Sequence, residues 1–384
     1  MKILIIAFVN KGGALTDYLS QLCNALVSTN KVILIAPHCS KTESFSPDVE
    51  MIHFSMSSNS INSMLQTINP FLFVKLTKKI NHINPDVIHI AFEPRFPFSF
   101  TWLLHRKYPI VTTIHELKPL PIGIIRTLIL NRIQIIDNKL LVKFSDKVIV
   151  HGKRDRKYLL AHGVPSYKIE VIPHGNFCFY THYREDEIIE VDNNNILFFG
   201  RMASYKGLGY LIEAGKNITK HISNATINAT ITIACKGDFS KYKKIIGQDN
   251  TFIILDRFIP NEEVAELFKK TSVVVLPYIA GTQSGIITIA GSFKKPIVVT
   301  DVGNFSDMVE NGKTGFIVPP KNANALAEAI IRLLNDDKLR HEMGDNAYKM
   351  VKEKFSWDNI AQRILETYKE AVEARGKKAL NKNR

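Results

Sequence analysis

The sequence has few cysteines and no long apolar run. Its four cysteines, Cys23, Cys39, Cys178 and Cys235, lie far apart without a C-x-x-C pair. A disulfide framework or a cysteine-based zinc site is therefore not expected, and a reducing compartment fits best. No segment reaches the roughly 18–20 uninterrupted apolar residues of a membrane-spanning helix. The apolar start at residues 1–8 is short and lacks a small-residue cleavage site, so it predicts a buried strand in a cytoplasmic protein.

Motifs of two common hydrolytic mechanisms are also missing. The chain has no Asp-x-Asp pair, no H-E-x-x-H helix motif and no G-x-S-x-G turn. These patterns supply metal ligands or an activated serine in many enzymes. Their absence disfavours a metal-dependent or serine-nucleophile mechanism, and we predict no metal site.

Acidic residues are in the minority. Fifty Lys and Arg stand against 36 Asp and Glu, which gives a formal charge of +14. Such an excess attracts phosphate-bearing partners, which are nucleic acid, anionic lipid or a nucleotide. The length of 384 residues and the 45% of hydrophobic residues are typical of a globular protein with two domains.

Short β-branched runs alternate with helix-length segments along the whole chain. Continuous apolar strands separated by helices are typical of parallel sheets that are covered on both faces. We therefore predict an α/β protein with two doubly wound, Rossmann-like domains. The predicted strands of the first sheet are residues 3–8, 31–37, 86–91, 110–114 and 147–150, and those of the second are residues 196–200, 230–235, 252–255, 273–277, 296–300 and 315–318.

Two segments interrupt this pattern. Apolar periodicity lapses over residues 175–195, where we place the linker between the domains. Residues 337–373 are helical by pattern and no strand follows them. The chain then ends in a basic tail from Arg375 to Arg384, which we expect to fray.

Ligands of parallel sheets bind at the carboxyl ends of the strands, where helix N-termini offer free N–H groups. Gly12 and Gly13 follow the first strand, and they form either a phosphate-approaching turn or a plain tight turn. Arg201 and Lys206 flank the turn after the strand at 196–200. They can both reach one anionic group there, although a solvated basic loop is the alternative.

A third turn and two histidines complete the candidates. The polar segment Thr282-Gln283-Ser284-Gly285 precedes a predicted helix over 286–293, which favours an anion site. Thr282 or Ser284 is alternatively an N-cap. His115 follows the predicted strand at 110–114, and His174 lies in the segment that closes the first domain. Each has either a catalytic or a structural role, whereas His105 and His151 are expected to be structural.

These motifs, in this order, resemble those of the GT-B glycosyltransferases of the retaining family 4. Seven motifs over nearly the whole chain carry the resemblance: Lys11-Gly12-Gly13-Ala14, Thr113-Ile114-His115-Glu116, Val171-Ile172-Pro173-His174-Gly175, Phe199-Gly200-Arg201 with Tyr205-Lys206-Gly207, the segment 295–303, the segment 311–316, and Phe355-Ser356-Trp357.

The resemblance implies the organisation of the chain. Residues 1–175 would be the acceptor-side domain and residues 176–355 the nucleotide-sugar domain, with the two sheets facing across a cleft. Residues 356–384 would form a helix that returns to the first domain, followed by the basic tail. Members of this family move a sugar from a nucleotide diphosphate to an acceptor with retention of configuration, usually without a metal.

The resemblance also implies roles for individual residues. Arg201 and Lys206 match the family's diphosphate-binding pair. Gly12 and Gly13 match a loop that approaches the same diphosphate from the other domain. His115 matches the active-site histidine near the donor sugar. Fixed cations and N–H donors suit this reaction, because negative charge develops on the leaving diphosphate.

The nucleoside would lie near Lys236 and Arg257. No cofactor is implied beyond the donor, a UDP-sugar or a GDP-sugar.

The chain departs from the family at two positions. Gly281 and Ile289 occupy the places where glutamates usually stand. It resembles instead a branch in which the turn at 282–285, with Gln283, Ser284 and backbone N–H groups, would hold the sugar.

The partners follow from these inferences. The acceptor would be a glycan or a lipid-linked molecule in cell-surface polysaccharide or glycolipid synthesis. Basic and aromatic residues at 95–107 and 117–136 suit either an anionic inner-leaflet surface, with a peripheral location, or core helices with basic outer positions. Nucleic acid is disfavoured because the basic residues are scattered. The alternative from another class is a catalytically inactive sugar-nucleotide-binding or scaffold protein, suggested by the missing glutamates.

Overall fold

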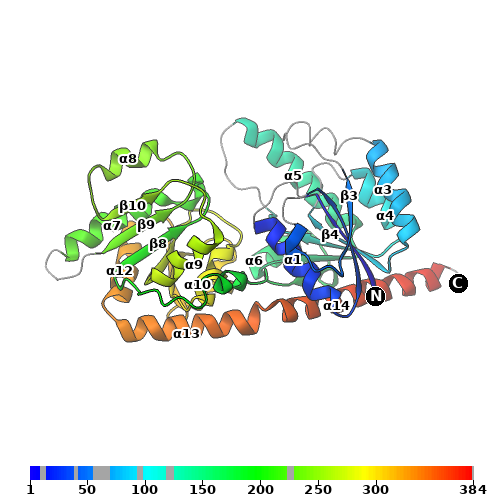
Figure 1. The fold of residues 1–384 in the computed structure, drawn as a ribbon. Coiled ribbons are helices and arrows are strands. Elements are labelled where there is room, and N and C mark those ends of the chain that lie inside the picture. Colours follow the sequence, from blue (N-terminus) through cyan, green and yellow to red (C-terminus); the bar gives the residue numbers. More distant parts are fainter. Residues whose placement is uncertain are drawn as a thin grey trace. The chain divides into compact units, whose positions relative to one another are not determined.

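The computed structural model describes residues 1–8, 14–38, 42–54, 70–92, 98–117, 125–222 and 229–382. They form two compact units (Figure 1). The first unit holds the described residues up to Gly175 together with those from Trp357 onward. The second unit is Asn176–Ser356. Each unit is built around one parallel sheet, so the predicted fold class is confirmed.

The sheet of the first unit has the strand order β3-β2-β1-β4-β5-β6-β7. Every neighbouring pair is parallel. Its central strands are buried on both faces because their side chains are nearly all apolar. The strands are β1 (Lys2–Ala7), β2 (Lys31–Pro37), β3 (Glu50–Phe54), β4 (Val87–Phe92), β5 (Ile110–Ile114), β6 (Lys147–Val150) and β7 (Ile169–Val171). The five predicted strands are confirmed within one residue, and the edge strands β3 and β7 were not predicted.

The sheet of the second unit has the order β10-β9-β8-β11-β12-β13 and is also parallel. All six predicted strands are confirmed within one residue at each end. The strands are β8 (Asn195–Phe199), β9 (Thr230–Ala234), β10 (Phe252–Leu255), β11 (Val273–Leu276), β12 (Ile297–Thr300) and β13 (Gly315–Val318). In both units the strand order reverses beside the first strand, which is where ligands of doubly wound sheets bind.

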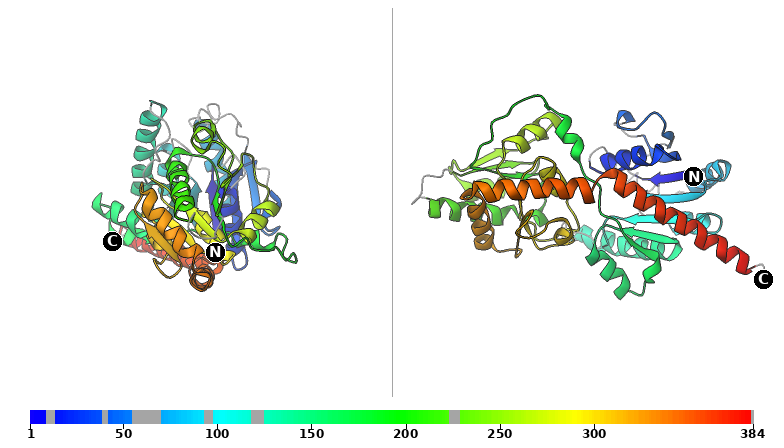
Figure 2. Two further views of the ribbon diagram at one scale, coloured as in Figure 1. Left: turned by 90° about the vertical axis from the view of Figure 1, so that its left-hand side faces the viewer. Right: turned by 90° about the horizontal axis from the view of Figure 1, so that it is seen from below.

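Helices cover both faces of the first sheet. The described helices are α1 (Ala14–Val27), α3 (Pro70–Ile83), α4 (Phe98–His105), α5 (Ile125–Phe144), α6 (Lys153–Ala161) and α14 (Trp357–Lys382). Helices α1 and α14 share one core with strand residues such as Ile3 and Ile5, into which Leu22 and Ile364 pack. Figure 2 shows α14 running along the elements of this unit. The predicted return of the C-terminal helix to the first domain is therefore confirmed.

The expected fraying of the basic tail is wrong for its described part. Helix α14 continues to Lys382, and Arg375 on it is only partly exposed. The Arg375 guanidinium donates to the backbone oxygens of His105 and Tyr108. It also lies 3.1 Å from a carboxylate oxygen of Asp146. These contacts fix the helix end on the unit, which composition alone does not indicate.

The second sheet is covered in the same way. Its helices are α7 (Leu208–Ile222), α8 (Ser240–Ile246), α9 (Asn261–Lys270), α10 (Gly285–Ser292), α11 (Phe305–Met308), α12 (Ala323–Leu334) and α13 (Asp337–Lys354). Helices α7 and α12 share one core, and α9 and α10 share the other. Helix α13 packs on α10, where Gly291 admits the Val351 side chain. Within the described residues, no helix of either unit is long and apolar enough to cross a bilayer.

Candidate functional site

In the second unit, the turns after β8 and β9 are hydrogen-bonded to each other. The Gly200 N–H donates to the Ala234 oxygen at 3.1 Å, and the Met202 N–H donates to the Lys236 oxygen at 3.3 Å. A Cβ on Gly237 would lie 2.2 Å from that of Met202, so only glycine allows this approach. Arg201 and Lys236 therefore belong to adjacent turns at the carboxyl edge of the sheet, and both side chains are exposed.

The turn after β8 is also tied to the turn after β11. A short 3₁₀ helix, η4 (Ser204–Lys206), ends at Gly207 with φ +68°. A Cβ at Gly207 would lie 1.9 Å from the Pro277 oxygen. The Ile279 N–H donates to the Tyr205 oxygen at 2.7 Å. Glycine is required here by the left-handed backbone and by the close approach, and together these contacts hold Lys206 in place.

Lys206 has an unusual environment for a cation. Its residue is only 7% exposed, and its Nζ lies 5.2 Å from the centre of the Tyr278 ring. Among the described residues, no hydrogen bond or ion pair is found for this ammonium. Burial lowers the pKa of Lys206 to about 8, the Cys235 thiol opposes the shift, and the Arg201 charge adds to it. A buried ammonium without an anionic partner is costly, and a bound anion would relieve that cost.

Lys206 lies beside the start of α10. A Cβ built on Gly200 would lie 2.6 Å from the Lys206 Nζ and 3.2 Å from the Ile286 Cδ1, so the ammonium is close to the side chain of Ile286 in the first turn of the helix. Ser284 occupies the N-cap position without a side-chain cap bond, and its side chain hydrogen-bonds to Tyr278. The first-turn N–H groups of α10 therefore have no side-chain cap.

The backbone holds the turn that leads into α10. The Thr282 oxygen accepts from the Asn304 N–H at 2.7 Å. Gly285 packs against the Phe177 ring, since a Cβ there would come within 2.2 Å of it. Thr282 and Gln283 remain half-buried. The segment predicted from sequence thus forms a fixed, partly open turn at the same sheet edge as Lys206.

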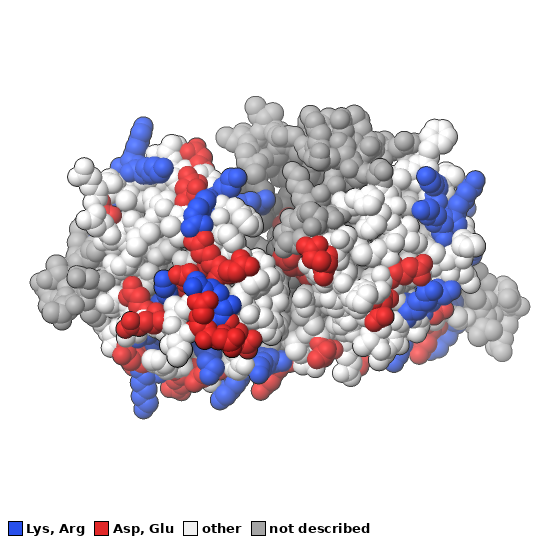
Figure 3. All heavy atoms as spheres, viewed as in Figure 1, with Lys and Arg blue, Asp and Glu red and all other residues white. Residues whose placement is uncertain are grey.

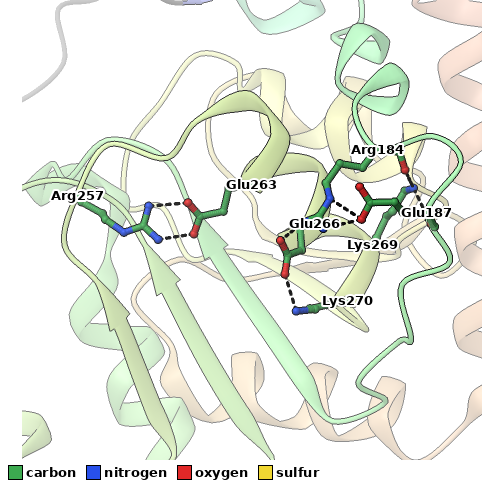
Figure 4. A network of polar contacts seen from close by, with 7 residues as sticks. All are labelled: Arg184, Glu187, Arg257, Glu263, Glu266, Lys269 and Lys270. Atoms are coloured by element: carbon green, nitrogen blue, oxygen red, sulfur yellow. Dashed lines mark hydrogen bonds and ion pairs between the residues drawn. The ribbon is translucent and has the colours of Figure 1, made fainter.

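Arg257 has a carboxylate partner. Its guanidinium forms two contacts with Glu263 at the start of α9 (Figure 4). The neighbouring Glu266 is also paired, with Arg184 and Lys270. The carboxylates of this side of α9 thus neutralise the cations around them, whereas Lys206 lacks such a partner in the described structure.

Charged residues on the surface are mixed in sign. On the face in Figure 3, Lys and Arg alternate with Asp and Glu over the described part of the second unit. Among the residues that the structure describes, no three or more His, Cys, Asp and Glu side chains are arranged to hold a metal ion.

In the first unit, the candidate site is built around His115. Gly12 and Gly13 lie outside the described residues. His115 directly follows β5, and its Nε2 lies 3.0 Å from the Ala91 oxygen. The Phe92 ring stacks on the imidazole with a centroid distance of 4.3 Å, and the Tyr18 ring meets it edge-on at 5.0 Å. The His115 ring is thus held in one orientation at the carboxyl edge of the sheet, where it keeps partial exposure.

His151 belongs to this site, although the sequence pattern predicted only a structural role. It follows β6, the neighbour of β5, and its Nε2 lies 3.0 Å from the His115 Nδ1. Its Nδ1 lies 2.9 Å from the Ile172 oxygen. His174, near the end of β7, has its ring 5.6 Å from that of His151. The signal was present in the sequence, since His115, His151 and His174 all follow strands that turn out to be neighbours.

A fourth histidine lies deeper in the sheet. His89 of β4 has its Nε2 2.8 Å from the Thr113 hydroxyl and its Nδ1 2.6 Å from the Tyr368 hydroxyl of α14. Burial lowers the pKa of His89 and His174 to about 3 and that of His151 to about 4. Burial and the neighbouring histidines hold the pKa of His115 well below its ordinary value. Without a bound anion, these lowered pKa values favour the neutral form of all four imidazole rings.

Comparison with known proteins identifies the family. Residues 15–175 match the model of "Glycosyltransferase Family 4", and residues 180–350 match that of "Glycosyl transferases group 1". An uncharacterised glycosyltransferase of Methanocaldococcus jannaschii is 32% identical over 200 residues, covering 51% of this chain and 50% of that protein. The alpha-D-kanosaminyltransferase of Streptomyces kanamyceticus is 27% identical and covers 47% and 46%. The chain spans about half the length of the curated relatives it matches.

Solved structures agree over nearly the whole chain. The sucrose-phosphate synthase of Thermosynechococcus elongatus has a TM-score of 0.78 at 19% identity, covering 97% of this chain and 99% of that one. Anabaena HepE in complex with UDP has a TM-score of 0.71 at 17% identity, covering 96% and 99%. At these identities the likeness concerns the fold. With family models matched on both units, the chain belongs to the family 4 glycosyltransferases and has the GT-B fold.

Proposed function

We propose that the protein is a retaining, metal-independent glycosyltransferase that moves a sugar from a nucleoside diphosphate sugar to a glycan or lipid-linked acceptor. The bond between the anomeric carbon and the diphosphate breaks, and a bond from an acceptor oxygen forms on the same face of the sugar. The acceptor loses a proton, and the nucleoside diphosphate leaves with increased negative charge. A site for this reaction needs preorganised positive charge at the leaving group.

The buried Lys206 ammonium is the observation that carries the proposal. It lies beside the first turn of α10, which has no side-chain cap, and no described carboxylate neutralises it. A helix N-terminus and a buried cation both favour an anion at the same place. A diphosphate would supply the missing partner, and the exposed Arg201 on the same turn can contact its outer oxygens.

The remaining candidates take complementary roles in this proposal. Lys236 and Arg257 would border the nucleoside. Arg257 would do so only if the nucleotide displaces Glu263 from its guanidinium. His115 would contact the donor sugar, and Gly12 and Gly13, outside the described residues, would approach the diphosphate. UDP is bound in the HepE structure, which favours a UDP-sugar over a GDP-sugar as donor.

The two missing glutamates require another way to hold the sugar. Gly281 has no side chain, and Ile289 is 5% exposed within the apolar core. Neither position can therefore present a carboxylate. In this proposal Gln283, Ser284 and the N–H groups at the start of α10 replace them.

The acceptor is proposed from relatives and from one surface. Relatives of this chain carry the names capsular polysaccharide biosynthesis glycosyltransferase, from Staphylococcus aureus, and lipopolysaccharide 1,2-N-acetylglucosaminetransferase, from Salmonella typhimurium.

In the first unit, Phe71 of α3 is 82% exposed and Trp102 of α4 is 39% exposed, with the Arg106 guanidinium 4.0 Å from the Trp102 ring centre. This supports peripheral binding to an anionic inner leaflet. Flotation with phosphatidylglycerol vesicles at low salt tests it, and no binding would remove it.

A non-catalytic scaffold is the second candidate, because Gly281 and Ile289 replace the glutamates. A thermal-shift screen with UDP, GDP, ADP and their sugar conjugates separates the two. Ligand at 100 times its dissociation constant adds about 2.7 kcal/mol of stability. We expect a shift with one nucleotide family that is lost in Arg201→Ala, together with slow hydrolysis of the matching donor. Binding without hydrolysis or transfer favours the scaffold, and no shift at all contradicts the donor site.

A further inference from the structure

The His115–His151 pair makes contacts that two neutral imidazoles cannot all satisfy. Four ring nitrogens are involved in three contacts: His115 Nε2 with the Ala91 oxygen, His151 Nδ1 with the Ile172 oxygen, and His115 Nδ1 with His151 Nε2 at 3.0 Å. A carbonyl oxygen only accepts, so the two nitrogens that face carbonyls must both carry protons.

The number of protons on the two rings decides whether these contacts can coexist. A neutral imidazole carries one proton, and both are used at the carbonyls. The nitrogens of His115 and His151 that face each other would then both present lone pairs at hydrogen-bond distance. A third proton, placed between them, converts this repulsion into an N–H···N hydrogen bond. Without it, one ring must change tautomer and leave a carbonyl facing a lone pair.

We propose that His115 and His151 act as one proton-binding pair that takes up a single proton from solvent when an anionic ligand binds at this edge of the first sheet. The bound pair carries one positive charge shared between two rings. His151 is then the positioning residue of His115, because it determines which His115 nitrogen carries a proton.

The surroundings explain why the third proton requires a ligand. The titratable groups next to the pair are Tyr18 and Asp17 on α1, His89 on β4, His174 after β7, Glu116 beside His115, and Lys153 two residues after His151. Burial and the neighbouring histidines lower the pKa of His115. Burial lowers the pKa of His151, and its hydrogen bond to the Ile172 oxygen only partly opposes this. No described carboxylate hydrogen-bonds to either ring. A charge on the pair is therefore costly until an anion arrives.

His89 shows the contrasting case within the same cluster. Its two nitrogens face the hydroxyls of Thr113 and Tyr368. A hydroxyl both donates and accepts, so a neutral His89 satisfies both contacts without an extra proton. The need for a third proton is thus a property of the His115–His151 pair and not of burial alone.

The ligand is an anion of the class that the proposed function supplies, a nucleoside diphosphate sugar, and the inference rests on that function for the identity of the ligand. Because binding takes up a proton, affinity rises as the pH falls. One proton corresponds to a change of up to about tenfold in the dissociation constant per pH unit. A nucleotide sugar is a better probe than free UDP, whose terminal phosphate itself ionises near about pH 6.

The first test uses the full chain labelled with ¹⁵N at its histidines. Ring nitrogen chemical shifts are followed by NMR from about pH 8 to about pH 5, without ligand and with saturating UDP-glucose or GDP-mannose. We expect the resonances of His115 and His151 to change together with one midpoint, as coupled sites do, and the midpoint to rise with nucleotide sugar. Two separate midpoints, or rings that stay neutral in both conditions, would overturn the proposal.

The second test uses His151→Gln, with His174→Gln as the matched buried control. The amide introduced by His151→Gln can donate to the His115 Nδ1, so a neutral His115 satisfies its contacts and needs no third proton. Calorimetry in two buffers of different ionisation enthalpy should show that the wild type and His174→Gln take up about one proton more per nucleotide sugar than His151→Gln does, because any uptake at Lys206 is common to all three proteins. Equal uptake by all three proteins contradicts the proposal.

The two proposals can fail separately. If no nucleotide sugar binds while inorganic pyrophosphate brings one shared midpoint of His115 and His151 into this pH range, the donor function is wrong and the shared proton stands. If nucleotide sugar binds with the same pH dependence in wild type and His151→Gln, the donor function stands and the proton-binding pair is wrong. Titration of Lys206 does not confuse the result, because it is present in all three proteins.

Discussion

In the first unit, the polar side chains at the carboxyl ends of the strands bond to each other and to backbone carbonyls. In the second unit, the Lys206 ammonium is buried beside the Tyr278 ring, without a carboxylate partner in the described structure. The contacts of the His115–His151 pair require one proton more than two neutral rings carry, whereas the buried lysine favours an anion. The first unit thus holds its polar groups in mutual contacts, whereas the second unit holds a cation for which an anion would be a favourable partner.

The largest expected effect is at Lys206. Lys206→Met removes the charge and keeps the buried stem, so we expect nucleotide-sugar transfer to fall by about 100-fold or more. The thermal stability of the ligand-free protein should stay equal or rise, because a buried unpaired charge is gone. Lys295→Met is the control: Lys295 is also partly buried in this unit, but its Nζ donates to the Lys269 oxygen. It should lose stability and keep nucleotide binding.

The pH dependence of Lys206 sharpens the same comparison. The pKa of Lys206 is lowered to about 8 by burial, so between about pH 8 and its ordinary value the unfolded chain binds more protons than the folded one. Stability relative to Lys206→Met should therefore rise with pH through this window. Nucleotide affinity should fall over the same window because the ammonium loses its proton. Denaturant unfolding measures the stability and titration calorimetry measures the nucleotide affinity. If both depend on pH in the same way in the wild type and in Lys206→Met, the lowered pKa of Lys206 is contradicted.

The next effect concerns the turn that holds Lys206. Gly207→Ala places a Cβ 1.9 Å from the Pro277 oxygen, and it does so at φ +68°. We expect a loss of more than about 2 kcal/mol of stability and weaker nucleotide binding. Gly209→Ala is the matched control, two residues later in α7, where the nearest atom is 3.8 Å away. It should stabilise the helix by up to about 1 kcal/mol.

A smaller effect is expected in the first unit, at the end of α14. Arg375→Ala removes the hydrogen bonds to two backbone oxygens and the contact with Asp146. Since the guanidinium is partly exposed, we expect a loss of about 1–3 kcal/mol. Lys377→Ala, exposed on the same helix, should change little. Equal melting temperatures for the two variants would show that the helix end is frayed after all, as its composition indicates.

Sequence reasoning predicted the buried strands well and the edges poorly. β1, β2 and β11 are almost continuous apolar runs, and such runs are typical of central parallel strands. β3 reads Glu-Met-Ile-His-Phe and is only half-buried, and β7 has three residues, so neither carries that signal. The pattern indicated where the sheets are but not how far they extend.

The candidate site was predicted only in part, because the sequence pattern does not show how residues on different elements pack together. Residues that follow strands were identified as candidates, and the described ones lie at the carboxyl edges of the sheets, but their environments depend on packing that spacing does not encode. Arg201 and Lys206 looked equivalent in sequence, yet one is exposed and the other is buried. His151 was assigned a structural role because the neighbour relation of β5 and β6 was not known. Arg257 could not be matched to Glu263 before α9 was placed.

The smallest expected effect distinguishes the two kinds of cation in the second unit. Arg257 is already paired with Glu263 (Figure 4), so its removal should change stability little, as for exposed ion pairs in general. If Arg257 also borders the nucleoside, Glu263→Gln frees it and tightens nucleotide binding, while Arg257→Ala weakens it. If the pair is only structural, both variants bind nucleotide alike. Opposite shifts in the dissociation constant would therefore add Arg257 to the donor site, and equal constants would leave the anion to Lys206, Arg201 and the start of α10.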